Sequence, residues 1–288
     1  MLAILRHTMS RSRTAILAWG LILAIYAGSM VTFYDNILEM SDMFTELISH
    51  YPEELVAFVG GAEGITEPEG YLDTYLFSYI APILGIYAIL AGSGLLVGDE
   101  ERGLLDLFIS HPISRTRLFL GRWVGFCLSL LLIVGLMWVG IVIPVGSTQL
   151  GLGAIDLVGP FLSLFAFLLL FGTLALLLSL ALPSRNLGAA VAGLVLGGGF
   201  MLNVIATIKP DLDSINQFSP FAYFQGGKAA AGMEWGWLVG LFAVALVFSL
   251  IAWLLFQRRD IRVVGEHGWG LPNILKRWNA NRRKAEAT

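Results

Sequence analysis

Six long apolar runs, separated by polar stretches, dominate the pattern of hydrophobic and polar positions along this chain. Each run is about 20 residues or longer, which is the length that a helix needs to cross a hydrocarbon core of about 30 Å. No run contains Asp, Glu, Lys, Arg or His. The pattern predicts an all-α, polytopic membrane protein with six transmembrane helices. The predicted spans cover residues 14–33, 74–97, 123–146, 157–182, 187–208 and 236–256.

The composition points to a lipid bilayer as the solvent. Of the 288 residues, 57% are hydrophobic and only 14% are charged, and the mean hydropathy is +0.76. A soluble globule of this composition would leave a large apolar surface in water. The first run follows Arg6, Arg11 and Arg13 and so also resembles a secretory signal. Its apolar core exceeds the about 7 to 15 residues of a signal peptide, so we expect an uncleaved helix.

Lys and Arg residues are segregated along the chain. All of them except Lys209 and Lys228 lie before the first span, between spans two and three or four and five, or after the last span. The positive-inside rule places these segments, and both termini, in the cytoplasm. The loop at 34–73 carries ten carboxylates and no Lys or Arg, and is predicted to face outward. We expect a multi-pass protein of the plasma membrane.

Two outward segments have patterns of their own. Apolar residues between Ile37 and Leu55 recur at helical spacing, which predicts one or two amphipathic helices in the first loop. The aromatic cluster at 219–224, close to Trp235 and Trp237, is typical of anchoring at the level of the lipid headgroups.

The segment at 98–122, between spans two and three, has the most informative pattern. Drawn as a helix, it is amphipathic, with leucines at 104, 105 and 107, but it is too short and too charged to span. Asp99, Glu100 and Glu101 suit the positive end of the helix dipole, and Pro112 stops the helix. The acidic pair lies within or beside the apolar arc, which favours docking to a protein partner. A solvated helix start is the alternative.

This segment resembles the signature of type-2 ABC transporter permeases, in which an acidic pair, a Gly, a Leu-rich helix and Ser-x-Pro-x-Ser-Arg follow one another. The resemblance extends to Ser219-Pro220-Phe221 and Arg258-Arg259-Asp260, and so covers nearly the whole chain. Leu104 departs from it, since Thr is common there. The resemblance implies a coupling helix that docks into an ATPase. The positions it implicates, with their apolar neighbours, are Asp99, Glu100, Glu101, Arg102, Gly103, Leu104, Leu107, Phe108, Ser110, Pro112, Ser114 and Arg115. Ser114 is also expected to cap the next helix.

The sequence lacks the motifs of several kinds of nucleotide-binding, metal-binding and catalytic site. No phosphate-binding loop is present, because Gly226-Gly227-Lys228 lacks the required spacing. No metal motif appears, Cys127 is the single cysteine, and the four histidines lie outside the spans. We therefore expect a non-enzymatic subunit with no cofactor of its own, no metal site and no nucleic-acid partner. ATP and Mg are expected on a partner subunit.

Span five contains small and polar residues with two possible roles. Ala189, Gly193 and Gly197 stand four apart and would allow close helix packing, within the chain or between two copies. Asn203 and Thr207 would either contact substrate or form an interhelical hydrogen bond.

The expected protein is one permease domain over residues 1–257 followed by a basic cytoplasmic tail over 258–288 that rests on membrane lipid. It is expected to pair with a second copy or a related permease, and with two cytosolic ABC ATPase subunits. Its substrate is expected to be amphiphilic or hydrophobic, such as a drug, an antibiotic or a lipid, and the resemblance implies export. The alternatives are an ATP-independent transporter or channel, and a non-transporting scaffold or sensor. The charge-free spans disfavour an ion-coupled carrier.

Overall fold

A computed structural model describes residues 2–40, 50, 67–100 and 114–258. Within these ranges every regular element is helical, and six helices are long and apolar enough to cross a membrane. The long helices are α1 (Leu2–Glu39), α5 (Ser78–Ser93) with its leading turns, α8 (Arg115–Val145), α9 (Val158–Ala181), α10 (Arg185–Ile208) and α12 (Trp235–Arg258). The six-helix, all-α prediction is confirmed for the described residues.

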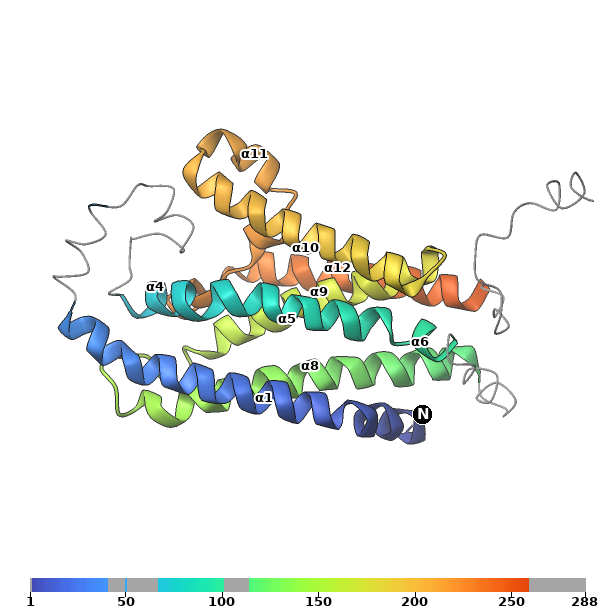
Figure 1. Cartoon of the computed structure of the whole chain (residues 1–288), viewed down its shortest axis with the longest axis horizontal. Helices are drawn as coiled ribbons and strands as arrows, with labels where there is room; N and C mark the ends of the chain where they lie inside the picture. The colour runs from blue at the N-terminus through green and yellow to red at the C-terminus, as the bar shows by residue number, and fades with distance from the viewer. Residues whose placement is uncertain (1, 41–49, 51–66, 101–113, 259–288) are drawn as a thin grey trace, which may run out of the picture.

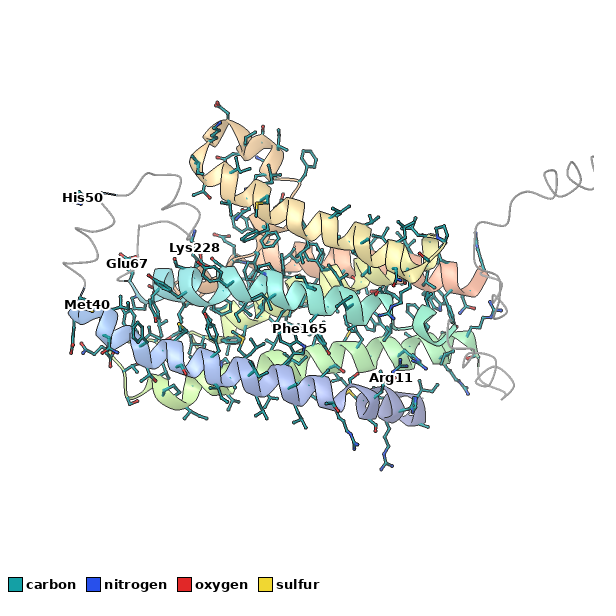
Figure 2. The ribbon with its side chains drawn as sticks, viewed as in Figure 1. Arg11, Met40, His50, Glu67, Phe165 and Lys228 are labelled. Atoms are coloured by element: carbon teal, nitrogen blue, oxygen red, sulfur yellow. The ribbon has the colours of Figure 1, made fainter. Side chains whose placement is uncertain are left out.

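The helices alternate in direction, so the bundle has two ends of different charge (Figures 1 and 2). What we call the basic end holds the N-terminus, the start of α8 and the end of α12, and with them every described arginine. The opposite, acidic end holds Asp35, Glu67, Asp73 and Glu234, together with Lys209 and Lys228. Figure 2 shows this separation, with Arg11 toward one end and Glu67 and Lys228 toward the other.

Helix α9 forms the centre of the bundle. It packs against α5, α10, α12 and α8, and its residues are the most buried of the six spans. Helices α1 and α8 form a separate close pair along one side (Figure 1). Small residues lie at the closest approaches: a Cβ on Gly28 would meet the carbonyl oxygen of Gly140, and one on Gly92 would overlap the backbone of Gly172. Close backbone approach of this kind is how helices associate in lipid, where no hydrophobic force drives them together.

Several helices extend past the predicted spans. Helix α1 has 38 residues, so it is about 57 Å long, whereas the hydrocarbon core is about 30 Å thick. Its last turns occupy part of the predicted loop at 34–73, and α8 likewise occupies 115–122 of the predicted coupling segment. A charge-free run marks only the part of a helix within hydrocarbon, because backbone hydrogen bonding continues into the charged flanks. The described residues contain the first turns after 34 but not 41–49 or 51–66, where the amphipathic helices were predicted.

The second span is not a uniform α-helix. It consists of α4 (Pro68–Leu72), a π-helical turn η1 (Asp73–Phe77) and α5, and it ends at Ser93 instead of residue 97. A turn at 94–96 then leads into the short helix α6 (Val97–Glu100). The π-turn lies at the acidic end, where it carries Asp73.

Between α10 and α12 the chain folds back over the acidic end in short turns. These are η2 (Pro210–Leu212), α11 (Asp213–Asn216), η3 (Pro220–Tyr223) and η4 (Gly226–Ala230). Phe221 of η3 is buried, with its ring centroid 4.8 Å from that of Phe167 and 5.6 Å from that of Phe200. The aromatic cluster therefore includes a core residue, contrary to the prediction of anchoring alone, because η3 dips between α9 and α10. Phe218, by contrast, is 88% exposed.

Candidate functional site

The predicted coupling segment lies at the basic end, and only its flanks are described. Asp99 and Glu100 belong to α6, and Ser114 and Arg115 begin the next helix. Ser114 caps α8 as predicted: its hydroxyl accepts a hydrogen bond from the backbone N–H of Arg117, at 3.3 Å. The remaining implicated positions, Glu101, Arg102, Gly103, Leu104, Leu107, Phe108, Ser110 and Pro112, lie outside the described residues, so their roles stay predictions.

Arg115 joins the start of α8 to the end of α12. Its Nη1 donates to the carbonyl oxygens of Phe256, at 3.4 Å, and Gln257, at 3.2 Å. The Gln257 side chain donates in turn to the hydroxyl of Thr116, at 2.8 Å. A guanidinium is favoured at the C-terminus of a helix, where carbonyl oxygens lack intrahelical partners and the dipole is negative. Arg115, within the predicted coupling segment, is thus bound to the last turn of the last span.

Two more arginines hold the other flank of the segment. Arg185, the first residue of α10, donates through Nη2 to the carbonyl oxygen of Leu90 and through Nε to the hydroxyl of Ser93. Arg122 is 3% exposed and donates to the carbonyl oxygen of Leu95, at 3.3 Å. Both therefore bind the chain where α5 ends. The described residues on both sides of 101–113 are thus hydrogen-bonded to neighbouring helices.

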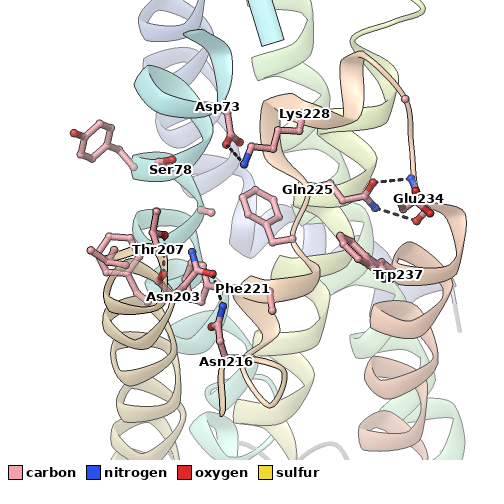
Figure 3. Close-up of a pocket in the computed structure, with 17 residues that line it drawn as sticks. Asp73, Ser78, Asn203, Thr207, Asn216, Phe221, Gln225, Lys228, Glu234 and Trp237 are labelled. Atoms are coloured by element: carbon pink, nitrogen blue, oxygen red, sulfur yellow. Dashed lines mark hydrogen bonds and ion pairs between the residues drawn. The ribbon is translucent and has the colours of Figure 1, made fainter. Parts of the chain in front are cut away.

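The acidic end contains a pocket of about 510 Å³ between α5, α10, the start of α12 and the turns that connect them (Figure 3). A volume in this range is typical of small-molecule sites. The lining combines polar and aromatic groups. Its polar members include Asp73, Ser78, Asn203, Thr207, Asn216, Gln225, Lys228 and Glu234, and its aromatic members are Tyr79, Phe200, Phe221, Phe224 and Trp237.

One wall of this pocket depends on contact between the π-turn and η4. Asp73 Oδ1 accepts a hydrogen bond from the backbone N–H of Gly227, at 2.9 Å, and Oδ2 lies 3.9 Å from Lys228 Nζ. Gly226 adopts φ = 51°, a left-handed conformation that L side chains rarely adopt, and a Cβ there would overlap Asp73 Oδ1. Glycine at 226 lets the carboxylate reach the next amide.

A second set of hydrogen bonds fixes the turn before α12. The backbone N–H of Gln225 donates to the hydroxyl of Ser163 in α9, at 3.1 Å. The Gln225 side chain donates to the backbone carbonyl of Glu234, at 3.1 Å, and accepts from its N–H, at 2.7 Å (Figure 3). The backbone of Glu234, an exposed residue that lines the pocket, is therefore held in place.

The two polar residues singled out in span five meet at this pocket. Asn203 Oδ1 accepts a hydrogen bond from Asn216 Nδ2, at 3.3 Å, and the hydroxyl of Thr207 donates to the carbonyl oxygen of Asn203, at 3.1 Å. The Asn203 pair links α10 to α11. Asn203 thus both forms a hydrogen bond between two elements and lies on the pocket wall.

The small-residue stripe of α10 does not pack as one surface within the chain. Ala189 lies against the core, but a Cβ at Gly193 or Gly197 would meet no heavy atom of the described residues within 4 Å. The face that packs against α9 and α5 carries Gly188, Ala192 and Leu196 instead, all of which are buried. Packing among the described residues therefore does not account for Gly193 and Gly197.

Sequence reasoning did not single out Asp73, Gln225, Lys228 or Glu234 as site residues. The sequence pattern places Asp73 at the end of an acidic loop. It indicates for Gly226-Gly227-Lys228 only that the spacing of a phosphate-binding loop is absent. Two signals are available: a carboxylate directly before an apolar run, and an outward lysine directly after paired glycines. Neither signal indicates that the two segments meet.

Comparison with known proteins was consistent with a transport role. Over 125 residues the chain is 30% identical to a probable ABC transporter permease protein, NosY, of Pseudomonas aeruginosa. That alignment covers 43% of this chain and 44% of the relative, so it spans less than half of either protein. The sequence model of the ABC-2 family transporter proteins matches residues 2–261, which is nearly the whole chain. The protein therefore belongs to the ABC-2 family, as a membrane-spanning permease.

Proposed function

We propose that the chain is the permease subunit of an ATP-driven exporter whose ATPase is a separate polypeptide. The observation that carries the proposal is the anchoring of the described residues on both sides of 101–113. The Glu-Glu-Arg-Gly motif at 100–103 and the Ser-x-Pro-x-Ser-Arg motif at 110–115 lie at the two ends of that stretch. Arg185 and Arg122 bind the exit from α5, and Arg115 binds α12. A segment tied to three helices at its ends can pass a push from a docked partner directly to those helices.

The orientation proposed here places the basic end in the cytoplasm of a plasma-membrane protein. Every described arginine lies at that end, as the positive-inside rule requires of cytoplasmic segments. Both termini and the coupling segment are then cytoplasmic, and the pocket at the acidic end faces outward.

The proposed assembly contains two cytosolic ATPase subunits and two permeases, identical or related. ATP and Mg are bound by the ATPases, because this sequence carries no phosphate-binding loop. The exposed face of α10 around Gly193 and Gly197 is available to a second permease. The cargo is amphiphilic or hydrophobic, since the six apolar runs of the spans contain no ionisable group to coordinate an ion.

Copurification tests this proposal. The tagged chain is purified in mild detergent from its native cells, and bound proteins are identified by mass spectrometry. We expect an ABC ATPase with wild type and its loss from Glu100→Arg combined with Glu101→Arg. Glu67→Arg combined with Glu69→Arg is the matched control, because it changes the same charges at the acidic end. This control should retain the ATPase.

The other outcomes are distinct. An ATPase retained by both double variants would contradict the docking residues but keep the ABC assembly. Its absence from wild type, with the fold intact, would overturn the proposal in favour of a gradient-driven transporter or a scaffold.

A further inference from the structure

An apolar groove lies beside the pocket at the acidic end. It has a volume of about 540 Å³ and is formed by α9, α10, α12 and η3. No charged side chain lines it, and its walls include Leu174, Val195, Gly240, Val244 and Phe248. Trp237 lines both the groove and the pocket, so the two cavities adjoin at this side chain. A polar cavity next to an apolar groove along membrane-spanning helices matches the shape of an amphiphile.

The pocket presents one available charge of each sign. The side chain of Lys228 is 79% exposed and touches Asp73 only at 3.9 Å. Asp73 Oδ1 is already engaged by Gly227, so this pair leaves most of the lysine ammonium open to a ligand. The carboxylate of Glu234 is exposed and forms no hydrogen bond or ion pair with the described residues, although its backbone is fixed by Gln225.

These charges discriminate among amphiphiles. An anionic headgroup would be attracted by Lys228 but repelled by Asp73 and Glu234, whereas a purely cationic one would be attracted by the two carboxylates but repelled by Lys228. A zwitterionic headgroup meets both signs. The face of Trp237 adds a favourable surface for an ammonium group.

We propose that the pocket and the groove together bind one zwitterionic phospholipid. The phosphate lies at Lys228, the ammonium lies at Glu234 beside Trp237, and one acyl chain occupies the groove between α10 and α12. The inference deepens the proposed function, on which it rests for the side of the membrane involved: the lipid comes from the outer leaflet.

Native mass spectrometry of the purified full chain measures the binding. The probes are dioleoyl phosphatidylethanolamine, the anionic dioleoyl phosphatidylglycerol with identical chains, and dihexanoyl phosphatidylethanolamine with the same head and short chains. Wild type should bind one dioleoyl phosphatidylethanolamine per chain, about tenfold more tightly than the phosphatidylglycerol. Equal affinity for the two dioleoyl lipids would overturn the assignment of the headgroup.

Two sets of variants locate the site. Lys228→Ala combined with Glu234→Ala should weaken phosphatidylethanolamine binding about tenfold. Lys209→Ala combined with Glu67→Ala removes the same charges from exposed positions at the same end that do not line the pocket, and should leave binding unchanged. If both double variants bind as wild type does, the site lies elsewhere and the proposal fails.

Filling the groove tests the acyl chain. A Cβ at Gly240 would meet no described heavy atom within 4 Å, so Gly240→Leu enters the groove without a clash in the fold. It should weaken binding of the dioleoyl lipid and spare the dihexanoyl lipid. Equal loss of binding for both lipids would show that the substitution distorts the fold and would contradict the acyl-chain assignment. Efficient formation of disulfide-linked dimers by Gly240→Cys, in the Cys127→Ser background, would show that a second copy covers the groove. ATPase copurification from the same preparations tests the proposed function separately.

Discussion

Arg115 Nη1 lies 3.2 Å from the carbonyl oxygen of Gln257, a contact across 142 residues that joins the first residue of α8 to the last turn of α12. The acceptor belongs to a helix end where carbonyl groups have no intrahelical donor. The same guanidinium also binds the carbonyl of Phe256.

Replacing Arg115 by Ala is expected to loosen the end of α12. The loss of a charged donor at a helix C-terminus costs about 1 kcal/mol, which corresponds to about fivefold faster exchange of the amide hydrogens. Hydrogen exchange with mass spectrometry over residues 253–258 measures this effect. Arg117→Ala is the control, because Arg117 is exposed and serves the cap only through its backbone N–H. Equal exchange in the two variants would contradict the role assigned to Arg115.

Gly140→Val should separate the pair formed by α1 and α8. A Cβ at 140 would overlap the backbone of Ala24, which cannot move away as a flexible side chain could. Overpacking of this kind costs about 1–3 kcal/mol. Unfolding in mixed detergent micelles measures the free energy of unfolding of each variant. Gly135→Val is the control in the same helix and should cost less than about 1 kcal/mol. A Cβ at 135 would meet no heavy atom of the described residues within 4 Å. Comparable losses at both positions would contradict this packing of α1 against α8.

Gly226→Ala should destabilise the pocket wall. The substitution places a side chain at φ = 51° and drives its Cβ into the Asp73 carboxylate. Strain of this kind costs about 1–3 kcal/mol, and relief by rotation of Asp73 would break the bond to Gly227. Thermal unfolding in detergent should show a lower midpoint than for Gly232→Ala, whose Cβ meets nothing described within 4 Å. An unchanged midpoint would mean that the turn adopts another conformation.

Ser249→Ala tests a hydrogen bond within the bundle. Trp123 Nε1 donates to the Ser249 hydroxyl at 2.9 Å, which links α8 to α12. Interhelical hydrogen bonds in membranes contribute only about 0.6 kcal/mol on average, so we expect a loss of that order. Ser29→Ala, which removes a bond within one exposed helix, should cost less by the same micelle unfolding assay. A loss at Ser249 no greater than at Ser29 would show that the interhelical bond adds nothing.

The sequence predicts those features of the fold that depend on neighbouring residues alone. The number of spans followed from runs without charge, and the Ser114 cap followed from a serine directly before a helix. The lengths of α1 and α8 did not follow, because hydrophobicity reports the thickness of the bilayer and not where backbone hydrogen bonding stops.

Contacts between distant segments were not predictable from one sequence. Asp73 and Gly227 are 154 residues apart, and neither the acidic loop nor the paired glycines specify the other as a partner. The contacts of Gly193 and Gly197 could not be predicted from the sequence either. A stripe of small residues predicts a close approach, but which face of α10 meets α9 depends on the shapes of both helices.

The π-turn at Asp73–Phe77 divides the second span into an outer part and an inner part whose rotations about the helix axis can be set separately. In it the N–H of Ser78 bonds to the carbonyl oxygen of Asp73, five residues earlier, so the turn holds one residue more than an α-helical turn. Losing or gaining a residue there rotates the outer turns by about 100° while the register of α5 against α9 stays fixed. A change of one residue in this turn would therefore redirect the outer turns without changing how α5 packs on α9.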